Sequence, residues 1–175
     1  MGIQVIAYTG LQKQFPESEK ETNALRAAMY VNEDPNLAAL TPHPAWPERA
    51  DYLSAGIYRF DEYVHNRLGP DGDFLASFLA VLSAKFLKRP YNEAFAEFQP
   101  GPFAELVNFR YVGNGLLFGP QTAAKLAQDF KDHAEQAAKE AAKEGAYFHQ
   151  TFVKLGDMFT WASEAGGAVA FSNGI

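Results

Sequence analysis

The stretch from Gly119 to Gly167 constrains the fold more than any other part of the chain. After Pro120, small and apolar residues recur every three or four positions as far as Ala141, and charged or amide side chains fill the positions between them. This period is typical of an amphipathic helix. Proline suits the first helical position, because the N–H that it lacks has no partner in the first turn. We therefore expect a helix that begins at Pro120 and ends at Gly145.

A second helix is expected directly after Gly145, from about residue 146 to residue 165. It carries large apolar residues on one face and beside it: Phe148, Phe152, Leu155, Met158, Phe159 and Trp161. A single glycine between two amphipathic segments favours an antiparallel helical hairpin over one rod bent at the glycine. Gly166 and Gly167 then end the second helix, and the run Ala168–Phe171 is expected to be a short strand.

The rest of the chain completes an α+β, mainly helical fold, with about five helices on a small sheet of terminal strands. The β-branched and aromatic run Ile3–Tyr8 predicts a strand that lies near the C-terminal one. Ser54 is the expected N-cap of a helix through Leu68. The apolar periodicity predicts two further helices, over about residues 73–89 and residues 103–107.

Between the first strand and Ser54 the signals are weaker. Residues 12–23 are polar and acidic, which is typical of an exposed loop, and residues 27–31 are expected to form a strand. Four prolines interrupt the segment from about residue 32 to residue 50: Pro35, Pro42, Pro44 and Pro47. We expect this segment to be irregular, either as a packed Ω-like loop or as a mobile arm.

Composition indicates one folded domain over residues 1–175. Hydrophobic residues make up 47% of the 175 positions, which supplies a substantial core. The lack of cysteine excludes disulfides, thiolate catalysis and cysteine-bound zinc. A formal charge of −6 disfavours nucleic acid and anionic membranes as partners. Because the sequence has no apolar run of about 18 residues and no signal-peptide pattern, we expect a soluble cytoplasmic protein without a membrane span.

Two Asp-x-x-x-His pairs are the candidate metal ligands: Asp61 with His65, and Asp129 with His133. On a helix this spacing puts the carboxylate and the imidazole on one face, about one turn apart. Two such helices packed side by side would form an Asp₂His₂ site, so a metal-dependent hydrolase is one alternative function. The competing interpretation is two ordinary surface ion pairs.

The glycine-rich turn from Gly113 to Pro120 is a candidate ligand site. Free backbone N–H groups at the start of the following helix can bind an anion such as a phosphate, with an arginine nearby. A small-molecule or nucleotide binder is therefore the second alternative function. The candidate residues are Arg59, Arg110, Tyr111, Gly113, Asn114, Gly115 and Gly119. The spacing differs from the dinucleotide fingerprint, and a turn that only packs against the core explains the same glycines.

Three motifs in the C-terminal half carry a resemblance. They are GPFAELVNF over residues 101–109, FGPQTAAKLAQDF over residues 118–130 and, after a helix, AGGAVAF over residues 165–171. In this order they resemble a group of uncharacterised bacterial and bacteriophage proteins. Those relatives carry an acidic turn where this chain has residues 110–115, which include no carboxylate. The resemblance implies a bacterial or phage source and no activity.

Neither the Asp–His pairs nor the glycine turn is specific enough to assign an activity. The sequence favours a small, non-catalytic accessory protein that binds another protein or associates with itself. It implies no cofactor, and the two alternative functions stay open.

Overall fold

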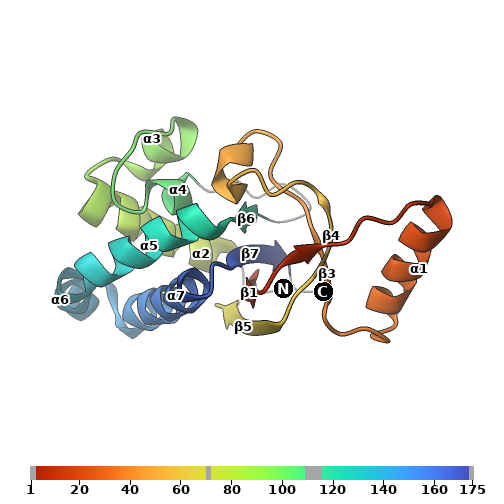
Figure 1. Ribbon diagram of the computed structural model, residues 1–175. Coiled ribbons are helices and arrows are strands. Elements are labelled where there is room, and N and C mark those ends of the chain that lie inside the picture. Colours follow the sequence, from red (N-terminus) through yellow and green to blue (C-terminus); the bar gives the residue numbers. More distant parts are fainter. Residues whose placement is uncertain (1–2, 70–71, 109–115, 174–175) are drawn as a thin grey trace.

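The computed structural model describes residues 3–69, 72–108 and 116–173 of the chain. In this part of the chain, seven α-helices and two antiparallel sheets form the α+β, mainly helical fold expected from the sequence (Figure 1). The strands are β1 Ile3–Thr9, β2 Gln12–Lys13, β3 Leu37–Leu40, β4 Gly56–Arg59, β5 Glu62–Leu68, β6 Leu116–Phe118 and β7 Ala168–Asn173. The α-helices are α1 Glu19–Tyr30, α2 Gly72–Leu82, α3 Tyr91–Ala96, α4 Ala104–Val107, α5 Pro120–Asp132, α6 Ala134–Glu144 and α7 Ala146–Glu164.

The expected helical hairpin is confirmed, because α7 packs against both α5 and α6. Most of its large apolar residues face inward, and Leu126, Leu155 and Phe159 are fully buried. The first helix of the hairpin is not continuous, since the backbone of His133 leaves the helical region and separates α5 from α6. At this break the imidazole packs against the ring of Phe86, with 5.4 Å between the ring centroids.

The terminal strands pair as expected. β1 lies between β5 and β7 in a four-stranded sheet of order β5-β1-β7-β6, and β4 lies between β2 and β3 in a second sheet. One face of β1 and β7 joins the core beneath the helices through Val5, Val169 and Phe171. The chain passes from one sheet to the other at Gly10, whose φ is +62°. A Cβ atom there would lie 2.0 Å from the Asp61 carboxylate, so the bend requires glycine.

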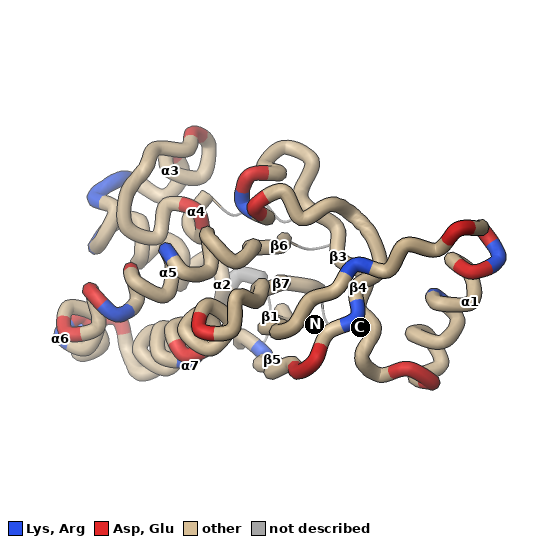
Figure 2. Tube along the Cα trace, in the orientation of Figure 1, with Lys and Arg blue, Asp and Glu red and all other residues tan. Residues whose placement is uncertain are grey.

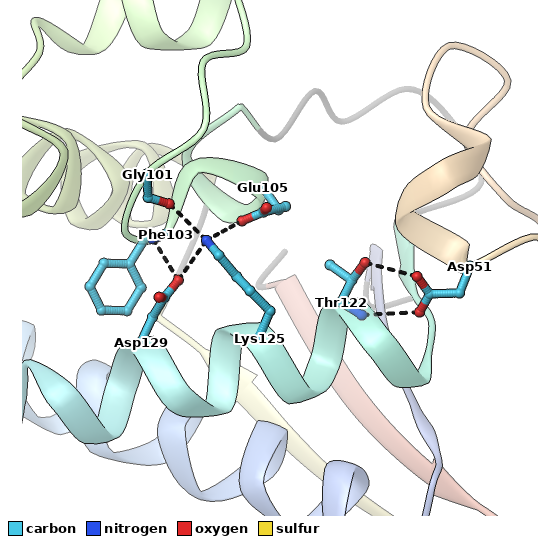
Figure 3. Close-up of polar contacts among 7 residues, drawn as sticks. All are labelled: Asp51, Gly101, Phe103, Glu105, Thr122, Lys125 and Asp129. Carbon is cyan, nitrogen blue, oxygen red and sulfur yellow. Dashed lines mark hydrogen bonds and ion pairs between the residues drawn. The ribbon is translucent and has the colours of Figure 1, made fainter.

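A cluster of phenylalanine rings forms the centre of the core. Phe103 and Phe152 each pack edge to face against Phe130, with ring centroids 4.9 Å and 4.8 Å apart. The backbone of Phe103 has a φ of +58°, which is unusual for a bulky residue. Its N–H donates to the Asp129 carboxylate at 2.8 Å, and the Lys125 ammonium pairs with the same carboxylate at 2.7 Å (Figure 3). The contacts of Asp129 on α5 therefore hold the backbone at Phe103, whose ring fills the core.

Two predictions for the N-terminal half are wrong. Residues 54–68 form β4, a bend and β5 instead of a helix. Val64 and Leu68 lie four positions apart, a spacing that fits a strand period of two as well as a helical turn. Pairing with β1 along the whole of β5 then decides in favour of the strand. Residues 19–30 form helix α1, where we expected a loop followed by a strand.

The proline-rich segment packs against the body of the protein and is not entirely irregular. It contains β3 and a short 3₁₀-helix, Pro47–Ala50. Arg49 of this helix is 2% exposed, and its guanidinium donates to the carbonyl oxygen of Asn108 at 2.7 Å. The same guanidinium lies over the ring of Trp46, 4.7 Å from its centroid. These contacts favour the packed-loop alternative over the mobile arm.

Candidate interaction surface on the α1 arm

The first metal pair does not have the geometry that the sequence suggested. Asp61 lies in the bend before β5 and His65 lies on β5 itself, and both are exposed. Because an extended chain rises about 3.3 Å per residue, four residues separate the two by roughly 13 Å instead of one helical turn. This strand, unlike a helix, does not bring the carboxylate and the imidazole together.

The second metal pair is engaged in other contacts. The Asp129 carboxylate binds the N–H of Phe103 and the ammonium of Lys125, and the His133 ring packs against aromatic rings. Among the residues that the structure describes, no three His, Cys, Asp or Glu side chains lie close enough to hold a metal ion. The described residues therefore do not bring together the shared Asp₂His₂ site that the hydrolase hypothesis needs.

The N-terminus of α5 is not a free anion site, because a carboxylate of the same chain fills it. Oδ2 of Asp51 accepts the N–H groups of Gln121 and Thr122 at 2.7 Å and 3.0 Å. The hydroxyl of Thr122 donates to Oδ1 at 3.2 Å (Figure 3). At Gly119 a Cβ atom would lie 2.3 Å from the Ala50 carbonyl oxygen, so this glycine permits a close approach of two segments. The packing interpretation explains Gly119 without a ligand.

Five of the candidate ligand residues lie outside the described residues: Arg110, Tyr111, Gly113, Asn114 and Gly115.

Arg59 belongs to β4, and its guanidinium makes two hydrogen bonds to the Asp34 carboxylate, at 2.7 Å and 3.2 Å. These hydrogen bonds hold the pKa of the Asp34 carboxyl below its usual value. The ion pair of Arg59 with Asp34 therefore anchors the segment between α1 and β3 to strand β4.

Helix α1 stands apart from the rest of the molecule, joined to it by the two chain segments that continue into β2 and β3 (Figure 1). None of its 12 residues is buried. Its inner face carries Thr22, Leu25, Ala28 and Met29, all half-buried. We call residues 14–36, which comprise α1 and its two connections, the α1 arm.

Local interactions explain why α1 is helical without a core to pack on. The Ser18 hydroxyl accepts the N–H of Glu21, and the Glu21 carboxylate reaches back to the N–H of Glu17. This arrangement resembles a capping box. At the other end Asn32 is left-handed, and the N–H of Glu33 donates to the carbonyl of Ala28 at 2.9 Å, as in a Schellman motif. The Ser-x-x-Glu spacing was the sequence signal that could have predicted this helix.

Large apolar side chains of the α1 arm face the solvent. Phe15 is 80% exposed, Tyr30 is 90% exposed and Val31 is 59% exposed. Two hollows flank Phe15 and Pro16. One of about 580 Å³ lies on the side of Leu25, and another of about 450 Å³ lies between Arg26 and the β-strands. The arm therefore offers both exposed aromatic rings and cavities large enough to receive side chains.

The α1 arm is strongly acidic. It contains Glu17, Glu19, Glu21, Glu33 and Asp34 against Lys20 and Arg26. The difference of five acidic and two basic residues is −3, half of the formal charge of the whole chain. Acidic residues lie at both ends of α1 (Figure 2).

Comparison of the chain with protein-family models, curated proteins and solved structures finds no match. The resemblance to uncharacterised bacterial and bacteriophage proteins therefore stays a prediction. In the described part of the chain, no helix has the length and apolar character needed to cross a lipid bilayer.

Proposed function

We propose that this chain is a non-catalytic accessory protein whose α1 arm docks a second protein. The observation that carries the proposal is a 12-residue helix with no buried residue, which ends at the exposed Tyr30 and is preceded in the chain by the exposed Phe15. A helix of this length is only marginally stable in water, and most helices gain their stability from tertiary packing. Exposed apolar groups that lie together commonly mark a protein interface. A partner that covers α1 would supply the missing burial.

The charge of the α1 arm supports a basic partner. Acidic residues occur at both ends of α1, so two copies of this helix packed antiparallel would place like charges against each other. A segment of another protein with apolar residues flanked by Lys or Arg fits better, since its cations would face Glu19, Glu21 and Glu33. Its apolar side chains would enter the hollows beside Phe15. The exposed rings of Phe15 and Tyr30 are the expected anchors.

Site-specific crosslinking tests this function. A photoreactive phenylalanine analogue replaces Tyr30 in the full chain, and in a matched control it replaces Tyr52, which is 82% exposed but lies outside the arm. In lysate of the native host, a discrete crosslinked protein is expected with the Tyr30 probe and not with the Tyr52 probe. Equal crosslinking from both positions would contradict docking on the arm.

The captured protein is then purified and titrated against the chain and its variants. Phe15→Ser and Tyr30→Ala are each expected to raise the Kd about 30-fold, which corresponds to the roughly 2 kcal/mol typical of a buried aromatic anchor. Tyr52→Ala is expected to leave the Kd unchanged. The Kd should also rise with added salt, because the proposed contact pairs acidic with basic groups. Arm variants that bind as tightly as the unmodified chain would rule the proposal out.

A further inference from the structure

The outer edge of β5 is an open sheet edge. In the described part of the chain β5 pairs only with β1, and its seven residues are exposed or half-buried apart from Leu68. Because alternate residues of a strand direct their N–H and C=O groups to opposite sides, about half of these groups point away from β1. Such an edge is a template for another strand, and proteins usually shorten or cover it. Seven residues are long for an unprotected edge.

Charged side chains near this edge make no polar contact within the described part of the chain. Glu62 and Arg67 lie at opposite ends of β5, and Lys154 lies on α7. In the described residues, none of the three side chains makes a hydrogen bond or an ion pair. Arg67 and Lys154 both line a hollow of about 490 Å³ at the end of the strand, together with Leu68, Gly69, Phe74 and Tyr147. The charged groups that line this hollow are therefore cations.

The sequence of β5 complements itself when two copies run antiparallel. The register that overlaps all seven residues is centred on His65, and it places residue 62 opposite 68, 63 opposite 67 and 64 opposite 66. Tyr63 of one copy then faces Arg67 of the other on the same side of the sheet, a favourable cross-strand pair of ring and cation. Glu62 falls opposite Leu68, at the hollow that Lys154 lines. The twofold symmetry repeats both contacts.

We propose that β5 pairs with β5 of a second copy of this chain and joins the two four-stranded sheets into one eight-stranded sheet. The occupant is a second copy because the two charged residues of β5 each fall opposite a complementary group of the same chain, Glu62 near Lys154 and Arg67 against Tyr63. A twofold contact of this kind is closed, since the β5 edge of each copy is paired with the β5 edge of the other. This surface is separate from the α1 arm and does not depend on the function proposed for that arm.

Sedimentation velocity from low micromolar to near-millimolar protein tests the proposal. The unmodified chain is expected to pass from one chain to two as its concentration rises, and never to a larger species. Glu62→Lys and Lys154→Glu are each expected to raise the dimer Kd at least about tenfold, because each places like charges together. The double variant restores the opposite charges, so its Kd is expected to return to within about threefold of the original. Glu93→Lys on α3, which lies far from β5 (Figure 1), makes the same change in net charge as Glu62→Lys. It should leave the dimer Kd unchanged.

Hydrogen exchange locates the interface in the backbone. Amides of residues 62–68 are expected to exchange more slowly in the dimer than in the dilute single chain, while amides of β6 are unaffected. A chain that stays single at near-millimolar concentration overturns the proposal. So does a dimer that Glu62→Lys leaves intact, that Glu93→Lys weakens equally, or that shows no protection of residues 62–68. Circular dichroism of each variant confirms that the fold is retained before the Kd values are compared.

Discussion

Asp51 offers a sharp test of how the proline-rich segment is held, because its carboxylate alone caps a helix 70 residues away in sequence. It accepts two backbone N–H groups and one hydroxyl at the start of α5. Loss of a helix-capping acceptor costs about 1 kcal/mol, and loss of a negative charge at a helix N-terminus costs roughly 0.3 to 1 kcal/mol. Asp51 also has a φ of 52°, which alanine adopts at a further cost of about 1 kcal/mol. We expect Asp51→Ala to lower the free energy of unfolding by about 2 to 3 kcal/mol.

Urea denaturation of three variants separates these contributions. Asp51→Asn keeps an acceptor and tolerates the left-handed backbone, so a loss of about 1 kcal/mol is expected from the missing charge and the weaker bonds. Asp51→Gly removes the cap without backbone strain, and its loss should lie between those of the asparagine and alanine variants. If Asp51→Ala costs less than about 0.5 kcal/mol, the capping argument fails, since that is the range of ordinary surface substitutions.

Three further predictions concern stability and can be measured in the same way. Gly167→Ala should unfold the protein or lower the free energy of unfolding by more than about 3 kcal/mol, because a Cβ atom there would lie 1.8 Å from the Tyr8 carbonyl oxygen. Gly166→Ala should lower it by only about 1 kcal/mol, because the space there is open and only the φ of +61° opposes alanine. Equal losses of stability in the two variants would contradict the steric argument. Phe103→Ala should cost about 3 to 5 kcal/mol, because the ring is fully buried among other rings; a loss below about 1 kcal/mol would mean that the site collapses without a cavity. Burial, and to a smaller extent the charge of Tyr63, raises the pKa of Tyr8 from 10.0 to about 12. The unfolded chain therefore loses this proton first, and the free energy of unfolding should fall by roughly 2 to 3 kcal/mol as the pH rises from 10 to 12. Tyr8→Phe should remove that part of the pH dependence, and an unchanged profile would show that Tyr8 does not cause it.

The C-terminal half was predictable because local signals and tertiary packing agree there. Pro120, Gly145 and Gly166 mark the ends of elements whose apolar faces have a single period, and the structure keeps α7 and β7 close to the expected bounds. The break at His133 was not predictable, because it depends on rings that belong to distant segments.

The N-terminal half was harder to predict, because its local patterns are ambiguous and several of its contacts join residues far apart in sequence. The spacing of Val64 and Leu68 fits two periods, and only the pairing of β5 with β1 resolves it. The cap of α5 by Asp51 joins residues far apart in sequence, which no local pattern shows. Helix α1 is the reverse case. Its caps are visible in the sequence at Ser18 and Glu21, but the lack of any buried residue on it can be learned only from the structure.

The central claim is that helix α1 is left uncovered for a partner. Amide hydrogen exchange of α1 in the isolated chain tests this claim most directly. Its helicity depends on caps worth about 1 kcal/mol each and on no buried residue, so local opening should need only a few kcal/mol. We predict that the amides of α1 exchange at least about 100-fold faster than those of α5 and α7, whose apolar faces are buried. Ser18→Ala should accelerate exchange in α1 further and leave α7 unchanged. Protection of α1 equal to that of α7 in the single chain would show that the helix is already packed, and would contradict the claim.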